Sequence, residues 1–565
     1  MCYYKRKKKG VRTMKKIVSV ILSVLMIFAV MSPAVSAAEE KEVTVYIEGY
    51  GSGLYGKSGE KAFPVELGLV EKLETMLGDL LANLAWAELT GDYTRYSQQL
   101  YDLIAPGYAD LKLDNNGESR KDDGTWYYGL GYDPLTKVDH SNGRFADGYY
   151  RFIYDWRLSV EYNAELLEKF IGLVMAKTGA KKVNLVGRCL GGNIISALLE
   201  NASEATINSI DKVVMYISST LGVDFISALF SGKIVLDPDA VDNYVTYSLK
   251  DNDILGDAIE GEMFEGLTTI INFINEIYVL GYGADVVEKI VESVREDALA
   301  RILRDSYASF PSFWSMVCSD DVEDAIAFIY NTPELQEEYK GMIEKIRSYH
   351  ENVQVNAEDR MLELEAKGME IMVISKYNYA DFPLSENASQ QSDGTAGTRA
   401  TSFGATVAPF GSALTEKYIK AMDKDDIKYL SDDKMIDAST CVFPDKTWFV
   451  KNLYHANFPQ CVDSLIDVFF RTEGMTVETM KEYPQFMKYD KETGELSEVT
   501  GLDKGDIIDK DSLEAKTSVF MRILKMIFDF LTKLLEGKII DFGPAPERPE
   551  NSLIPTLPTL PKTAE

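Results

Sequence analysis

The feature that most constrains this chain is a strand–turn–helix pattern in residues 183–199. Residues 183–186 are largely apolar, and Gly187 ends that run. One reactive side chain, Cys189, follows two residues later, and small residues then open a helical pattern. A buried strand that turns directly into a helix begins a crossover unit, so this stretch predicts a parallel sheet covered by helices.

The same stretch matches the nucleophile elbow of α/β-hydrolases, Gly-x-Ser-x-Gly, with one change. Residues 187–191 are Gly-Arg-Cys-Leu-Gly, so Cys189 stands where the pattern has serine. A thiol at a helix N-terminus and beside a histidine can form a thiolate–imidazolium pair, which makes Cys189 a credible nucleophile. The alternative is a small buried side chain in a fold that has lost its activity.

Further strand patterns alternate with helical ones, which indicates βαβ units and a mostly parallel sheet. The predicted strands cover residues 43–47, 152–155, 213–218 and 371–375, and residues 164–175 have the spacing of an amphipathic helix. From 221 to 368 the pattern is almost entirely helical. An insertion of that length between two strands predicts a helical cap over the site, with a separate helical domain as the alternative.

The ends of the chain differ in composition from this α/β-hydrolase domain, which we place at residues 38–470. Residues 1–37 have a basic start, an apolar segment and small residues before the boundary, as in a secretory signal peptide, and they predict a secreted or cell-envelope protein of bacterial type. A membrane anchor is the alternative. Residues 471–543 are predicted to be a helical extension, in which 520–535 pack on the body or lie on a membrane surface. Residues 544–565 form a Pro-rich tail.

The chain is strongly acidic, with a formal net charge of −30 that becomes −38 without residues 1–37. Such acidity argues against nucleic acid as a partner. Four cysteines remain after residue 37, and Cys441 with Cys461 could form one bridge outside the cell. No motif points to a cofactor or a metal ion.

A nucleophile needs a base, and the chain has three histidines, His140, His350 and His455. In α/β-hydrolases the order is nucleophile, acid, histidine, with the histidine in a loop after a late strand. His455 meets both conditions because it follows the apolar run at 447–453. The alternative for His455 is a surface or core histidine without a catalytic role.

The acid is expected in a loop between the strand at 371–375 and His455. Residues 429–437 offer Asp432, Asp433 and Asp437, and Asp445 lies nearby. We predict Asp432 as the acid and Asp433 as the alternative, although an aspartate in so acidic a chain can equally be a solvated surface charge.

Two backbone amides are predicted to hold a developing oxyanion. The Leu190 amide lies at the start of the elbow helix, where the helix N-terminus adds positive potential. The Tyr50 amide lies in the Gly-rich turn at 49–53, directly after the first strand. A tight turn without a catalytic role is the alternative for that segment.

The segment Tyr-Asp-Trp-Arg at 154–157, followed by a helix and by Gly-Arg-Cys-Leu-Gly-Gly at 187–192, resembles the lecithin:cholesterol acyltransferase family. The turn at 49–53 is similar to that family's oxyanion turn, and Ser-Phe-Pro-Ser at 309–312 to a segment of its cap. The resemblance implies a capped α/β-hydrolase that acts on ester-linked acyl chains of lipids. Two residues depart from the family pattern, Cys189 in place of serine and Arg188 in place of the preceding histidine. The glycines of the family's acid loop are also missing around Asp432.

The sequence thus leads to a secreted lipid-acyl hydrolase or O-acyltransferase that works through Cys189, His455 and Asp432 and a thioester intermediate. Its partner would be a lipid or other acyl-ester substrate, with membrane-surface contact through the cap or the C-terminal helix. The alternative is a catalytically inactive envelope protein that binds a lipid or a protein. No cysteine-peptidase motif surrounds Cys189.

Overall fold

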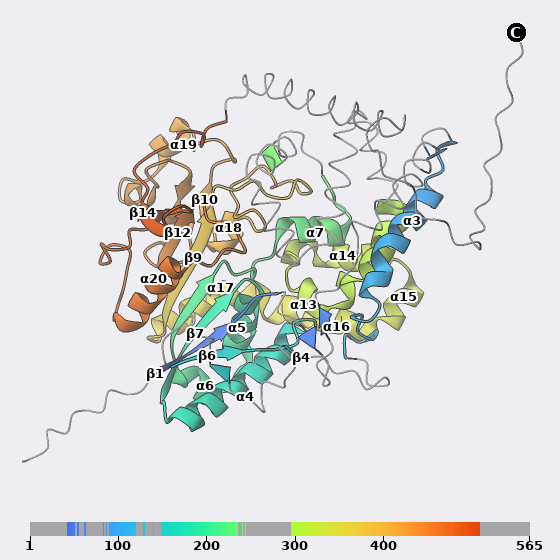
Figure 1. Ribbon diagram of the computed structural model, residues 1–565, viewed down its shortest axis with the longest axis horizontal. Coiled ribbons are helices and arrows are strands. Elements are labelled where there is room, and N and C mark those ends of the chain that lie inside the picture. The colour runs from blue at the N-terminus through green and yellow to red at the C-terminus, as the bar shows by residue number, and fades with distance from the viewer. Residues whose placement is uncertain are drawn as a thin grey trace, which may run out of the picture.

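The fold was analysed in a computed structural model of the chain (Figure 1). The structure describes residues 42–50, 90–119, 148–235 and 295–508, with short pieces at 54–55, 61–63, 83, 86–87, 128–129, 139–140, 240 and 243–244. The predicted signal peptide, the helix at 520–535 and the Pro-rich tail therefore lie outside the described residues.

A nine-stranded sheet forms the centre of the described part, in the order β14-β13-β12-β9-β8-β7-β1-β6-β5. All neighbours in it are parallel except the two outermost pairs, β5 with β6 and β13 with β14. Its strands are β1 (Glu42–Ile47), β5 (Asp139–His140), β6 (Tyr149–Phe152), β7 (Lys182–Arg188), β8 (Ile210–Tyr216), β9 (Glu370–Tyr377), β12 (Thr447–Lys451), β13 (Phe486–Asp490) and β14 (Glu495–Glu498). Two small sheets are formed by β2 (Leu54–Tyr55), β3 (Lys61–Phe63) and β4 (Tyr128–Gly129), and by β10 (Thr406–Val407) and β11 (Ile436–Asp437).

The central strands are buried on both faces because their alternate residues pack against different helices. In β8, Val213 and Met215 join the cluster that includes helices α4 and α5, whereas Val214 and Tyr216 join the cluster of helix α20. This alternation explains why the strands read as continuous apolar runs in the sequence. Because these strands are parallel, the loops that follow β7, β9 and β12 lie at one edge of the sheet.

Helices cover both faces of this sheet (Figure 1). Helix α4 is defined at both ends, by the Ser159 hydroxyl that accepts from the Tyr162 amide and by Gly179 in the left-handed conformation. The described helices are α3 (Thr94–Ile104), α4 (Val160–Thr178), α5 (Leu190–Asn201), α6 (Glu204–Ser209), α7 (Asp224–Ser231), α12 (Ala300–Arg304), α13 (Pro311–Trp314), α14 (Val322–Ile329), α15 (Pro333–Glu338), α16 (Lys340–Asn352), α17 (Ala357–Ala366), α18 (Thr398–Thr401), α19 (Glu416–Ala421) and α20 (Gln460–Arg471).

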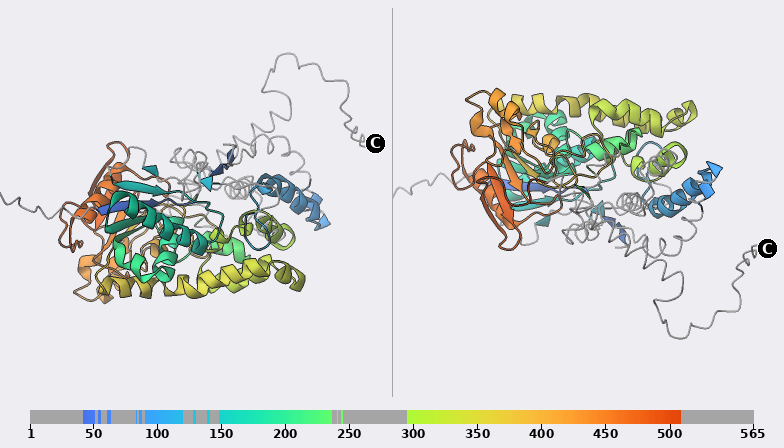
Figure 2. Two further views of the ribbon diagram at one scale, coloured as in Figure 1. Left: turned by 90° about the horizontal axis from the view of Figure 1, so that it is seen from below. Right: turned by 90° about the horizontal axis from the view of Figure 1, so that it is seen from above.

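Between β8 and β9 the described residues contain helices and turns but no strand, in line with a helical insertion. Its helices α12 to α16 extend from one end of the sheet, next to α3, as Figure 2 shows from two sides. The insertion shares one continuous apolar cluster with α4 and α5, so it packs on the hydrolase body through Phe310, Phe313 and Trp314.

The α/β class and the mostly parallel sheet are confirmed, and the strands predicted at 43–47, 183–186, 213–218 and 371–375 coincide with observed ones to within a few residues. The strand predicted at 152–155 is displaced, because β6 ends at Phe152. The boundary at 470 is wrong, because β13 and β14 extend the same sheet to Glu498. Residues 472–508, which follow α20, are therefore part of the sheet domain and contain no helix. Cys441 and Cys461 are both free thiols, so the disulfide considered for them is absent.

Candidate active site

The elbow at the end of β7 is a strained turn. Cys189 lies between β7 and α5 with φ of 50° and ψ of −120°, a backbone conformation that L-residues rarely adopt. A side chain at Gly191 would collide with the carbonyl oxygen of Ile47, and a Cβ at Gly187 would lie 2.8 Å from the backbone of Gly191. The small residues of the motif thus allow helix α5 to approach β1 and β7 closely enough to present the thiol at the sheet edge.

His455 lies in the loop after β12 and is held by Asp393. Its Nδ1 is 2.7 Å from the Asp393 carboxylate, and its backbone amide donates to the Asp393 carbonyl at 2.9 Å. The Cys189 side chain lies close enough to the His455 ring to raise the pKa of the imidazole. The structure therefore brings thiol, imidazole and carboxylate together, with the imidazole bonded to the carboxylate.

The electrostatic environment of His455 favours a protonated imidazole. Burial lowers the pKa of His455, but the charges of Asp393 and Cys189 and its hydrogen bonds to both outweigh burial and raise it to about 10. Burial opposes ionisation of Asp393 too, yet the His455 charge and hydrogen bond hold the pKa of that carboxyl below its usual value. An imidazolium between a carboxylate and a sulfur is the arrangement that a cysteine nucleophile requires.

Asp393 is fixed by its own loop, within the stretch that follows β9. Its other oxygen accepts hydrogen bonds from the amides of Thr395 and Ala396, at 3.0 and 2.7 Å. Gly394, with φ of 91°, permits the sharp turn, and a side chain there would meet the ring of Tyr454. The carboxylate is thus oriented before any substrate binds.

The prediction of Asp432 as the partner of His455 is wrong, because Asp393 occupies that position. Asp432 is exposed, on a turn that precedes β11. The alternative, Asp433, is fully buried but is paired with Lys451 at 2.9 Å and accepts a hydrogen bond from the Tyr377 hydroxyl at 3.0 Å. Asp433 therefore links its own turn to β9 and β12 through Tyr377 and Lys451, and it does not orient His455.

The sequence did contain a signal for Asp393. Residues 392–396 are Ser-Asp-Gly-Thr-Ala, which keeps the Asp-Gly-x core of the Gly-Asp-Gly-x-Val pattern that hydrolases of this kind use at the acid. The segment lies in the long loop after β9, at 385–412, whose Ser, Thr, Gly and Ala content hid it among turn residues. Its position after β9, and before His455, fits the expected chain order.

A buried lysine supports the loop that carries His455. Lys376, near the end of β9, has no exposed surface, and its ammonium donates to the carbonyls of Tyr454, His455 and Asn457 at 3.0, 2.9 and 2.8 Å. Burial lowers the pKa of Lys376 to about 7, against the favourable charge of Asp393. The Tyr454 carbonyl also accepts from the Asn457 amide at 3.1 Å, whereas among the described residues Lys376 is the donor given for the carbonyls of His455 and Asn457.

Arg188, which precedes the nucleophile, has a structural role. It is buried and pairs with Asp463 of α20 at 2.7 Å, and its guanidinium lies 4.5 Å from the ring centre of Phe458. Lys376 approaches the same ring at 4.4 Å. Arg188 thereby links the elbow to the segment between the His455 loop and α20, where it replaces the histidine of the family pattern.

The predicted oxyanion groups lie on either side of the thiol. Leu190 is the first residue of α5, so its amide belongs to the first turn, whose amides have no partner within the helix. Tyr50 follows Gly49, where an added Cβ would lie 3.0 Å from the Cβ of Cys189. The turn at Gly49 therefore touches the elbow directly, and Gly51–Gly53 lie outside the described residues.

The family segment at 154–157 supports this turn. The Tyr154 hydroxyl donates to the Glu48 carbonyl at 2.7 Å, and Trp156 packs edge-on against Tyr50 with ring centres 4.4 Å apart. Arg157 pairs with Asp155 at 2.6 Å and donates to the Leu111 carbonyl. The segment thus orients the backbone beside Cys189 without contributing a reacting group.

The other two histidines take no part. His350, on α16, is buried between Gln354 and the Trp314 carbonyl, while His140 lies on the edge strand β5. Across the residues that the structure describes, no group of three or more His, Cys, Asp or Glu side chains is arranged to hold a metal ion. Over the same residues, no helix is both long and apolar enough to cross a bilayer.

Comparison with known proteins gives a family match and several solved structures, two of which are described here. The chain is similar to a structure described as the Tle4-Tli4 complex, with 12% identity, 61% of this chain and 75% of the other covered, and a TM-score of 0.21. It is also similar to a lipase-esterase related protein from Clostridium acetobutylicum ATCC 824, with 12% identity, 55% and 95% covered, and a TM-score of 0.15. No curated protein matches the chain. The model of the lecithin:cholesterol acyltransferase family matches residues 150–367, from β6 through the elbow to α17, and confirms the resemblance found in the sequence over that part of the chain.

Proposed function

We propose that this protein is an acyl hydrolase or acyltransferase that acts on ester bonds through a Cys189–His455–Asp393 triad. The observation that carries the proposal is the His455–Asp393 hydrogen bond at 2.7 Å beside Cys189, whose side chain is near enough to raise the pKa of His455. A protein that only binds a lipid or a partner has no need for a buried imidazole raised to a pKa of about 10 beside a strained cysteine. We therefore favour the enzyme over the inactive binding protein.

The proposed reaction has two halves. The Cys189 thiolate attacks the ester carbonyl, and the amides of Leu190 and Tyr50 stabilise the oxyanion that forms. When the ester C–O bond breaks, the His455 imidazolium gives its proton to the leaving alkoxide, and a thioester remains on Cys189. Water or an alcohol then attacks the thioester while His455 accepts its proton, which releases the acid or the new ester and regenerates the thiolate.

The substrate class follows from the family match and from the surroundings of the thiol. Tyr50 packs against Trp156 and against Phe313 of the helical insertion, whose ring centre lies 4.8 Å away. These three rings are buried against one another, so the segment beside the elbow is apolar, which suits an acyl chain. We propose a lipid ester as the donor, reached outside the cytoplasm if residues 1–37 act as a signal peptide, with membrane contact through the insertion or residues 520–535.

The test is hydrolysis of p-nitrophenyl acyl esters of increasing chain length by the purified chain. Activity should be lost in Cys189→Ala and in His455→Ala and kept in His350→Gln, which removes a buried histidine outside the triad. Release of acyl product at equal rates by all four proteins would overturn the proposal. A long-chain alcohol added as acceptor separates transfer from hydrolysis by the ratio of ester to free acid.

A further inference from the structure

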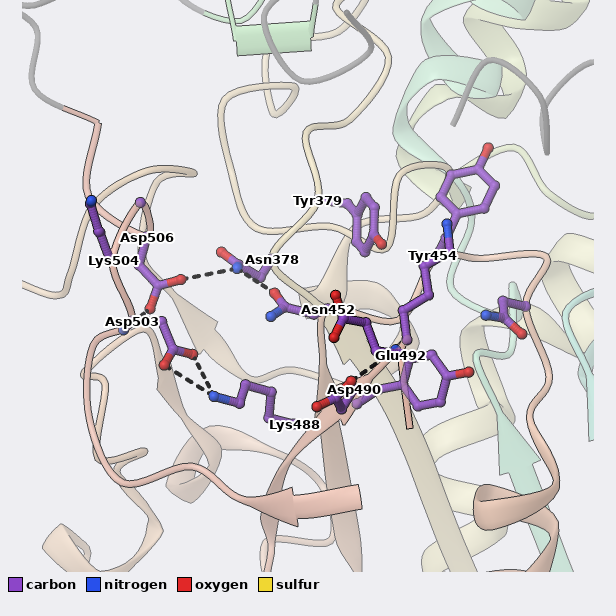
Figure 3. Close-up of a pocket in the computed structure, with 14 residues that line it drawn as sticks. Asn378, Tyr379, Asn452, Tyr454, Lys488, Asp490, Glu492, Asp503, Lys504 and Asp506 are labelled. Atoms are coloured by element: carbon purple, nitrogen blue, oxygen red, sulfur yellow. Dashed lines mark hydrogen bonds and ion pairs between the residues drawn. The ribbon is translucent and has the colours of Figure 1, made fainter. Parts of the chain in front are cut away.

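A second cavity lies behind the His455 loop, at the ends of β9, β12 and β13 (Figure 3). It has a volume of about 500 Å³, within the range of small-molecule sites. Neither Cys189 nor Asp393 nor His455 lines it. A ligand in this cavity would therefore be distinct from the acyl group on the thiol.

The charged groups of the cavity largely neutralise one another. Lys488 binds both oxygens of Asp503, at 3.0 and 3.1 Å, and Asp506 pairs with the buried Lys451 and accepts from Asn378 at 3.2 Å. Figure 3 shows this polar side of the cavity, where Lys488 contacts Asp503 and Asn378 contacts Asp506. Further charges of both signs line the cavity, from Asp490, Lys491, Glu492 and Lys504, so no part of it carries a single sign of charge.

The opposite wall is aromatic. Tyr379 and Tyr454 lie with ring centres 5.6 Å apart and planes tilted by 60°, and Tyr489 completes the lining. Polar groups with unused hydrogen-bonding capacity stand between the two walls. The oxygen of the Asn452 carboxamide accepts from Asn378 at 2.7 Å. In the described part of the chain the nitrogen of that carboxamide donates to no group, and neither does the nitrogen of the Asn457 carboxamide.

We propose that this cavity binds a neutral carbohydrate of one or two sugar rings. Sugars present C–H faces that pack on tyrosine rings and hydroxyls that both donate and accept, which matches a wall of three tyrosines opposite carboxamides and paired charges. An acyl chain would leave these polar groups unpaired, and a simple ion would meet charges of both signs, because lysines and carboxylates line the cavity together. The proposal does not depend on the catalytic function proposed above.

Isothermal titration calorimetry of the full chain tests this binding without any turnover. The probes are cellobiose and N,N′-diacetylchitobiose, with sodium phosphate and spermidine as charged comparisons. We expect the sugars to bind with a Kd on the order of 0.1–1 mM, and Tyr489→Ala to weaken that Kd at least roughly fivefold. Tyr162→Ala, on the exposed face of α4, is the matched control and should bind like the parent.

Asn452→Asp provides a second variant that keeps the left-handed backbone of that residue, with φ of 60°, while it removes the donor. It should also weaken sugar binding, and a thermal melt verifies that each variant is folded. The proposal is overturned if neither sugar binds at millimolar concentration, if only the charged probes bind, or if sugar binding is unchanged in both cavity variants.

Discussion

Replacement of Asp393 with asparagine tests the assignment of the acid, the point at which sequence and structure disagree. Asparagine keeps the size of the side chain and can still accept from the amides of Thr395 and Ala396, so the loop should fold. It removes the negative charge that stabilises the His455 imidazolium. The expected effect is therefore on catalysis and, below the raised pKa of His455, on stability as well.

The magnitude follows from the pKa of His455, which rises from 6.5 to about 10 although burial lowers it. A difference of this size corresponds to about 5 kcal/mol of preference for the imidazolium. Asp393 and Cys189 share that preference, so loss of the Asp393 charge should remove roughly 3–4 kcal/mol. We expect kcat/KM to fall by roughly 10²- to 10³-fold.

The assay is hydrolysis of p-nitrophenyl butyrate at neutral pH, with Asp432→Asn as the matched control. Asp432 is exposed, and the carboxylate that contacts His455 is that of Asp393, so the Asp432 variant should keep the parental rate. The reasoning is refuted if Asp432→Asn loses activity and Asp393→Asn retains it. Thermal melts of both variants separate a catalytic effect from unfolding.

Three further predictions concern Lys376, Gly191 and the pKa of His455. Lys376→Met removes a donor from three carbonyls of the His455 loop and leaves those of His455 and Asn457 without one among the described residues, so kcat should drop at least about tenfold and the free energy of unfolding in urea should fall by about 2–4 kcal/mol. An unchanged kcat would exclude a positioning role. Gly191→Ala should destabilise the fold by about 1–3 kcal/mol because its Cβ collides with Ile47, whereas Gly172→Ala, in open space on α4, should not lower the Tm. The protonated His455 imidazole stabilises the fold fully below pH 6.5, and this contribution is lost as the pH rises through the raised pKa of about 10. The Tm should therefore decline over that pH interval in the parent, and it should decline less in Asp393→Asn.

The elbow and the histidine could be predicted from the sequence because each depends on a local pattern. Gly187, Cys189 and Gly191 define a turn between two regular elements, and His455 follows a recognisable apolar strand. The sheet was predictable for the same reason, since strands buried on both faces read as apolar runs. These elements can be identified from residues that are close in the chain, although the strands themselves pair over long separations.

The parts that were missed depend on contacts over long separations. Asp393 lies 62 residues before His455, in a loop without periodicity, and its function is set by that one distant contact. Lys376 interrupts an apolar strand, and only carbonyls 78 to 81 residues later explain why a lysine can be buried there. Strand β13 alternates over only five residues, Phe486–Asp490, too short a pattern to separate from the predicted helical extension.

The central claim is that Cys189 carries the acyl group, and intact-protein mass spectrometry after brief exposure to an acyl ester tests it most directly. We predict an added mass equal to one acyl group, located on the peptide that contains Cys189, sensitive to hydroxylamine and absent from His455→Ala. A chain that turns over the ester without an adduct on Cys189, or that is labelled equally with and without His455, would contradict the account.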